Sequence, residues 1–158
     1  MKKILFVMLS VISGAAICAV IMRKFSKDAA QNQEKKIIRL KSYYDVLNQW
    51  VSFLHSGNRI EEYFINNSYK TVAVYGMGEL GNRFIEELKG SSVNVKYGVD
   101  KNISEVRSDI PVYQLEEDLP EVDVVVVTAV FAFDKIAEDL SEKYDCPVVS
   151  LEDVIFSI

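Results

Sequence analysis

The sequence predicts an α/β fold: a small, doubly wound parallel sheet of about five strands, preceded by a transmembrane helix and an amphipathic helix. Three observations lead to this prediction. β-Branched runs alternate with helical stretches after residue 70, a glycine-rich turn joins the first strand to the next helix, and nineteen residues near the amino terminus carry no charge. We expect an anchor and basic flank in residues 1–27, a helical connector in 28–69, and the sheet domain in 70–158.

The apolar segment Ile4–Met22 spans roughly 28 Å as a helix, close to the thickness of a hydrocarbon core. It is longer than a usual signal-peptide core and no clear cleavage site follows it, so an anchor is favoured, with a cleaved signal as the alternative. Seven basic residues between Arg23 and Lys41 place the following domain in the cytoplasm. The expected location is the cell membrane, with a single pass and the bilayer as a partner.

The connector is predicted to be a helix from about residue 28 to residue 55. Its apolar residues fall at alternating spacings of three and four, as in a coiled-coil seam. Two interpretations stay open: the seam joins a second copy or a partner enzyme through residues 37–54, or the helix lays its apolar face on its own domain. Fewer than three full heptads favour the second. The seam residues are Ile37, Leu40, Tyr44, Leu47, Val51 and Leu54, and the stripe is widened by Tyr43, Trp50 and Phe53.

A glycine-rich turn follows the first predicted strand, Thr71 to Tyr75, and a helix follows the turn at once. The turn reads G-x-G-x-x-G in the strand-turn-helix context of a dinucleotide-binding fingerprint. Its first glycine permits a tight turn, its second lets a pyrophosphate approach the backbone, and its third lets the helix pack closely on the strand. A Walker A loop would continue with Lys-Ser/Thr, whereas Asn82 and Arg83 follow here, so nucleotide hydrolysis is not expected.

The second predicted strand, Val93 to Val99, ends at Asp100, where a carboxylate usually holds a ribose 2′-hydroxyl and repels a 2′-phosphate. The expected ligand is therefore NAD or a nucleotide sugar rather than NADP. The alternative is that Asp100 only opens a turn. The predicted ligand-binding residues are Gly76, Met77, Gly78, Glu79, Leu80, Gly81 and Asp100.

The remaining runs complete the predicted sheet. Pro111 to Tyr113, Val122 to Thr128 and Pro147 to Ser150 are expected to be strands three, four and five. A helical stripe that begins at Phe133 lies between the last two, and a final helical turn follows residue 150.

Composition excludes several function classes. The two cysteines, Cys18 and Cys146, form neither a disulfide framework nor a metal-binding pair, and His55 is the one histidine, so hydrolase triads and zinc sites are not expected. Residues 1–59 carry ten Lys/Arg and three Asp/Glu, whereas residues 60–158 carry eight and twenty. Such an acidic domain would repel nucleic acid, which we therefore exclude as a partner.

Catalysis is hard to place on this chain. The Tyr-x-x-x-Lys spacing of short-chain oxidoreductases occurs once, at Tyr97 and Lys101, but on a strand and its turn, where the side chains would not share a helical face. Cys146 has no neighbour that would activate its thiol. We expect no enzymatic activity from the chain alone.

Three segments of the chain, taken in order, resemble one protein family. They are VAVYGMGELGNRFIEEL, YGVDKN and IPVYQLEEDLPEVDVVVVTA, within about residues 70–155. The family is the Rossmann-type NAD-, CoA- or nucleotide-binding accessory domain of bacterial polysaccharide-biosynthesis proteins, which include nucleotide-sugar epimerase/dehydratases and sugar acyltransferases. The resemblance implies that Gly76, Gly78, Glu79, Gly81 and Asp100 border the ligand. No catalytic domain is attached here, which leaves the binding role.

The expected function is thus a membrane-anchored cytoplasmic domain that binds a nucleotide-type small molecule, as an accessory or sensing subunit in cell-envelope polysaccharide biosynthesis. Two alternatives stay open. One is an oxidoreductase or epimerase completed by a partner chain, and the other is an interaction module without a ligand.

Overall fold

The structure, a computed structural model, describes the backbone of residues 2–157 and the side chains of residues 22–104 and 106–157. The chain divides into two compact units, Met1–Lys41 and Ser42–Ile158. Helix α1 (Lys2–His55) is continuous, so the expected boundary at residue 28 is not a break between helices. The segment predicted to be the anchor, Ile4–Met22, lies outside the described side chains except for Met22. Among the residues that were described, no helix combines the length and apolar character needed to cross a membrane.

The second unit contains a five-stranded sheet in which every pairing is parallel, in the order β3-β2-β1-β4-β5. The strands are β1 (Thr71–Tyr75), β2 (Asn94–Val99), β3 (Val112–Tyr113), β4 (Val124–Val127) and β5 (Val148–Ser150). All five predicted strands are confirmed, with ends that move by up to two residues. This is the strand order of doubly wound nucleotide-binding folds, in which the crevice lies where the order reverses, between β1 and β4.

The two central strands are buried on both faces, which explains their composition. β4 consists of four consecutive valines, each fully buried, and every β1 residue after Thr71 is buried. Parallel strands covered on both sides read as continuous β-branched runs rather than as alternating patterns. The apolar sequence therefore predicts a central strand correctly.

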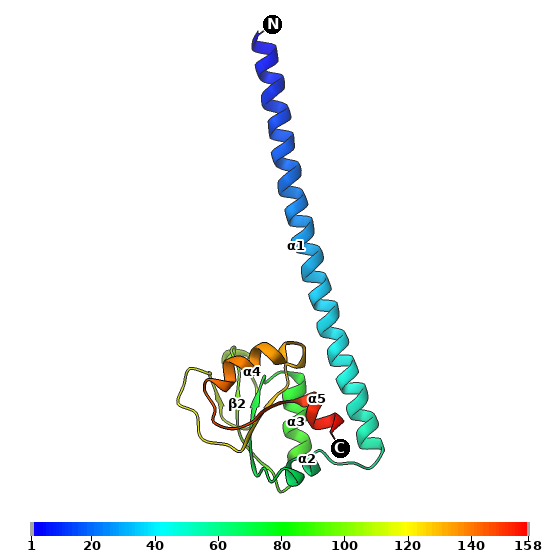
Figure 1. Ribbon diagram of the computed structural model, residues 1–158, viewed down its shortest axis with the longest axis vertical. Coiled ribbons are helices and arrows are strands. Elements are labelled where there is room, and N and C mark those ends of the chain that lie inside the picture. The colour runs from blue at the N-terminus through cyan, green and yellow to red at the C-terminus, as the bar shows by residue number, and fades with distance from the viewer. Residues whose placement is uncertain (1, 158) are drawn as a thin grey trace. The chain divides into compact units, whose positions relative to one another are not determined.

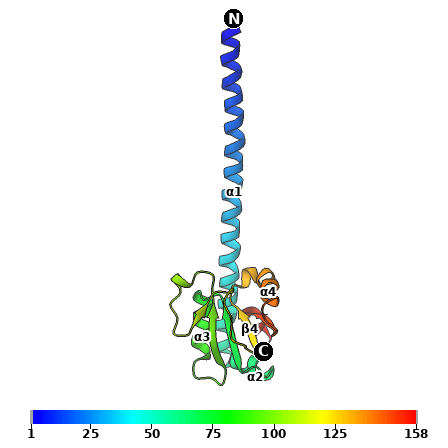
Figure 2. The ribbon, with the colours of Figure 1, turned by 90° about the vertical axis from the view of Figure 1, so that its left-hand side faces the viewer.

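Helices cover both faces of the sheet, as Figures 1 and 2 show for α3 (Glu79–Leu88) and α4 (Phe133–Ser141). One apolar cluster joins Val72 and Val126 to Phe84 of α3 and also takes in α2 (Glu61–Asn66) and α5 (Leu151–Phe156). The other joins the opposite sheet face to Leu140 of α4. The sheet is thus doubly wound, as predicted.

The connection from β2 to β3 has no α-helix, unlike those from β1 to β2 and from β4 to β5. It contains one 3₁₀ turn, η1 (Ile103–Glu105). Only Ile103, Val106 and Ile110 are apolar between residues 101 and 110, too few for an amphipathic helix stripe. A loop therefore makes this crossover.

The end of α1 packs on the domain with a different stripe from the predicted seam. Val46, Trp50 and Phe53 are buried in the core, with exposures of 0, 5 and 6%. The seam residues Leu47 and Val51 stay 42 and 52% exposed. The helix does lie on its own domain, as favoured. The contact is made by Val46 and by Trp50 and Phe53, two of the residues predicted to widen the stripe, and the seam residue Leu54 packs against the same core.

Candidate functional site

The glycine turn lies at the carboxyl end of β1, beside the point where the strand order reverses. Gly76 has a φ of +96°, a conformation that side chains rarely adopt, and its N–H donates to the Val99 carbonyl oxygen over 2.9 Å. The Thr128 hydroxyl donates to the Gly76 carbonyl oxygen over 2.5 Å. A Cβ at Gly76 would lie 2.9 Å from that hydroxyl oxygen. The turn is therefore tied to both neighbouring strands, and its first glycine is required by the fold.

Gly81 and Leu80 also serve the fold. A Cβ at Gly81 would overlap the carbonyl oxygen of Gly76, so only glycine lets the first turn of α3 pass this close to the end of β1. The Leu80 side chain is 5% exposed and belongs to the core between α3 and the sheet. The Leu80 side chain is therefore not available to a ligand, and Gly81 has none to offer.

Met77 is likewise held inside the protein. Its side chain is 4% exposed and fills the space over Gly98 of β2, where a Cβ would overlap the Met77 sulfur. Its backbone N–H donates to Oδ2 of Asp100 over 2.7 Å. This N–H is therefore already engaged, and Met77 contributes shape to the turn rather than a contact to a ligand.

Gly78 and Glu79 are the exposed part of the turn. Gly78 is the N-cap of α3, with an ordinary φ of −82° and no side-chain cap, and nothing lies within 4 Å of the position of a Cβ. The first N–H groups of a helix have no intrahelical acceptor, and they attract anions. The fold does not require glycine at position 78, so this residue leaves open backbone donors facing free space.

Asp100 organises the turn as well as facing the surface. Besides the bond to Met77, its Oδ1 accepts the N–H of Asn102 over 2.9 Å, which closes a local turn. Both sequence interpretations of Asp100 thus have a structural basis: it opens a turn, and it stands at the carboxyl end of β2 beside the glycine turn. A carboxylate can accept about four hydrogen bonds, so capacity for a ligand hydroxyl remains.

A cavity of about 520 Å³ opens beside the turn at the carboxyl ends of β1, β2 and β3. Its lining holds three carboxylates and one lysine. Burial raises the pKa of the Tyr75 hydroxyl in its wall, and the carboxylate of Asp100 raises it further. The cavity therefore suits groups that donate hydrogen bonds, such as sugar hydroxyls, and repels an additional phosphate. It is lined by Tyr75, Val99, Asp100, Lys101, Gln114, Leu115, Glu116 and Asp139.

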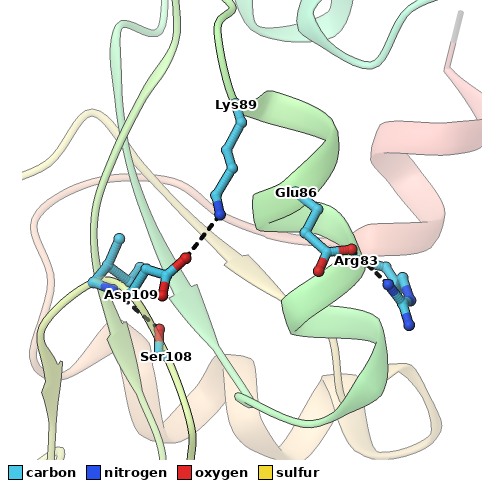
Figure 3. A network of polar contacts seen from close by, with 6 residues as sticks. Arg83, Glu86, Lys89, Ser108 and Asp109 are labelled. Carbon is cyan, nitrogen blue, oxygen red and sulfur yellow. Dashed lines mark hydrogen bonds and ion pairs between the residues drawn. The ribbon is translucent and has the colours of Figure 1, made fainter.

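A larger cavity, about 600 Å³, lies along the outer side of α3 but offers few unpaired charges. Figure 3 shows its polar side chains paired with one another: Arg83 with Glu86 at 2.6 Å, and Lys89 with Asp109 at 2.8 Å. It meets the glycine turn at Glu79, whereas the smaller cavity adjoins the turn through Tyr75 and through Asp100, which holds the Met77 N–H. We therefore place the candidate site at the turn and the smaller cavity.

The side chains considered for catalysis lie in surroundings that do not favour catalysis. Tyr97 is 1% exposed and its hydroxyl donates to the Pro120 carbonyl oxygen over 2.7 Å, while burial raises its pKa. Lys101 is exposed, so the two do not form a pair. Burial also raises the pKa of the Cys146 thiol, which disfavours the reactive thiolate. His55 is exposed at the end of α1.

Sequence reasoning missed several residues of the site. Thr128, Glu116 and Asp139 reach it from distant parts of the chain, and no spacing rule connects them to the glycine turn. Thr128 could have been suspected, because it is the single polar residue that ends the buried valine run. No family model, curated protein or solved structure matches this chain. Within the described residues, no three His, Cys, Asp or Glu side chains lie close enough together to hold a metal ion.

Proposed function

We propose that this chain is a membrane-anchored cytoplasmic domain that binds a dinucleotide or a nucleotide sugar at the Gly76–Gly81 turn. One observation carries the proposal: Gly78 begins α3 beside open space, although neither its φ nor any neighbouring atom requires glycine there. A phosphate that approaches the backbone closely would explain glycine at this position, because a side chain here would block it. The position of the turn, at the reversal of the strand order, supports the same conclusion.

The neighbouring cavity supports a ligand with sugar hydroxyls. Its carboxylates, including Asp100, Glu116 and Asp139, accept hydrogen bonds from hydroxyl groups but oppose a second phosphate site. In NAD and in nucleotide sugars the phosphates form one diphosphate group, and the sugar hydroxyls lie away from it. NADP carries an additional 2′-phosphate, so it fits this site less well. Bound NAD would supply a hydride acceptor. Among the described residues, neither Tyr97 with Lys101 nor Cys146 has the environment of a catalytic group. An accessory or sensing role is therefore proposed.

The biological setting is proposed on independent grounds. The resemblance of the three segments to accessory domains of bacterial polysaccharide-biosynthesis proteins suggests cell-envelope polysaccharide assembly. The apolar segment Ile4–Met22 and the basic residues after it suggest an anchor with the domain in the cytoplasm, where nucleotide sugars are made.

The test is ligand binding by the full-length chain in detergent, measured by calorimetry with NAD, UDP-glucose and CoA. Gly78→Val puts a branched side chain where a phosphate would approach, and the open space around it leaves the fold intact. We expect it to weaken binding at least about 100-fold, equal to the loss of two or more charge-assisted hydrogen bonds. Ser92→Val, an exposed substitution beyond the other end of α3, is the matched control and should bind as the parent does.

Equal binding by Gly78→Val and the parent would show that the turn is structural. If the folded parent binds none of the three probes, the interaction-module alternative is preferred. Steady conversion of UDP-glucose in the presence of NAD would instead establish the enzyme alternative.

A further inference from the structure

The last turns of α1 carry two adjacent apolar stripes, and the domain covers one of them together with Leu54, the last residue of the other. Val46, Trp50 and Phe53 are buried against the domain, as described above. Tyr44, Leu47 and Val51 point elsewhere and are 68, 42 and 52% exposed. Exposed apolar side chains that gather in one stripe, unlike single ones, mark an interaction surface.

The exposed stripe has the composition of a two-stranded coiled coil. With Ile37 at an a position, the a residues are Ile37, Tyr44 and Val51, and the d residues are Leu40, Leu47 and Leu54. Two of the three a residues, Ile37 and Val51, are β-branched and all three d residues are leucine, a combination that favours parallel dimers. Ile37 and Leu40 are also exposed, at 65 and 67%. A helix with the same spacing is the occupant that such a seam fits, and a second copy of α1 has that spacing.

A groove that shares residues with the seam adds a second observation. It measures about 280 Å³ and lies between the end of α1 and α3. Its floor is apolar, with Leu47, Val51 and Leu54, and charged residues of α3 form its rim. An apolar floor with a charged rim is typical of a protein interface.

We propose that two copies of this chain associate through Ile37–Leu54 as a parallel, in-register coiled coil. The direction rests on the anchor of the proposed function, because two chains anchored at their amino-terminal ends in one membrane run the same way. Anchoring also raises their local concentration. In-register pairing places Lys36 (g) near Lys41 (e) of the second copy, and the raised concentration offsets the repulsion between these like charges.

The test is disulfide cross-linking of the full-length chain in membranes, in a background of Cys18→Ala and Cys146→Ala. Leu47→Cys and Leu40→Cys each place a thiol on the seam, and Gln49→Cys places an equally exposed thiol on the opposite face. We expect a mild oxidant to link the first two and leave the third monomeric. Antiparallel pairing would put Leu40 opposite Val51, and the two position-40 thiols roughly 16 Å apart, beyond disulfide reach.

Each other outcome overturns the proposal. Linking at position 47 alone indicates a different helix direction, linking at all three positions indicates random collision, and linking at none indicates another occupant of the seam. Light scattering in detergent provides a second measurement: Leu47→Lys should weaken self-association at least about 30-fold, while Gln49→Lys leaves it unchanged. Neither assay involves a nucleotide, and the oxidation can also be carried out on chain that is not in membranes. A failure of nucleotide binding or of anchoring therefore stays distinguishable from a failure of the seam.

Discussion

Gly78 and Gly81 stand three residues apart in one turn and meet opposite steric conditions. At Gly81 an added Cβ would overlap the Gly76 carbonyl oxygen, whereas at Gly78 it would meet nothing within 4 Å. The G-x-G-x-x-G motif thus combines a glycine required for packing with a glycine whose space faces outward. Only Gly78, whose space faces outward, can be interpreted in terms of a ligand.

This contrast predicts different costs for one and the same chemical change. Gly81→Ala should lower the free energy of unfolding by about 1–3 kcal/mol through overpacking, despite the better helix propensity of alanine. Gly78→Ala should change it by less than about 1 kcal/mol. Urea unfolding followed by the emission of Trp50, the sole tryptophan, measures both. Equal losses would contradict the packing role of Gly81.

At the scale of elements, the strands were predictable and the faces of α1 were not. A buried run such as Val124–Val127 has one plausible environment, since both of its sides are apolar. Helix α1 offers two apolar stripes one position apart, through Trp50 and through Val51. Which one meets the domain depends on α3 and α5, and the periodicity of α1 alone contains no information about them. The acidic cavity was missed for the same reason, because Glu116 and Asp139 come from later elements.

Asp123 joins two elements at the amino ends of the central strands. Its Oδ2 accepts the N–H groups of Lys70 and Thr71 over 2.8 and 2.7 Å, and its own N–H donates to the Thr71 hydroxyl oxygen. These hydrogen bonds lower the pKa of the Asp123 carboxyl group, and the bond from the Lys70 N–H has the largest effect. The charged form is therefore favoured by folding.

Asp123→Ala is accordingly expected to lower the urea midpoint at pH 7. Because the folded pKa lies below the unfolded value of about 3.9, the stabilisation is complete above that value and is lost as pH falls through the folded pKa. The difference between parent and variant should shrink on acidification below about pH 4. A difference that stays constant through this range would show that the carboxylate charge is not involved.

For the whole molecule, charge divides the chain: the amino-terminal 59 residues are basic and the remainder is acidic. In the proposed arrangement the basic part lies beside anionic lipid headgroups, which attract it, while the acidic domain is repelled from them. Such a distribution keeps the surface of the domain accessible to small soluble ligands.

The full-length chain is therefore expected to sediment with membranes, to resist carbonate extraction, and to be protected from external protease in intact cells. Ile12→Arg combined with Ile17→Arg should release it, since each arginine costs about 2.5–3.5 kcal/mol at the centre of a membrane helix. Phe6→Leu, which keeps the segment apolar, is the control. Recovery from the medium with a shortened amino terminus would instead indicate a cleaved signal.

The bond from Thr128 to Gly76 spans 52 residues of sequence, and this separation bears on how the protein is made. A ribosome that has just synthesised the glycine turn has not yet made β4, which both flanks β1 and holds the turn. The turn gains its final form only after most of the domain has emerged, because contacts between distant parts of a chain form late. A nascent chain that ends before Val124 would carry the complete fingerprint sequence and still lack the strand that shapes it.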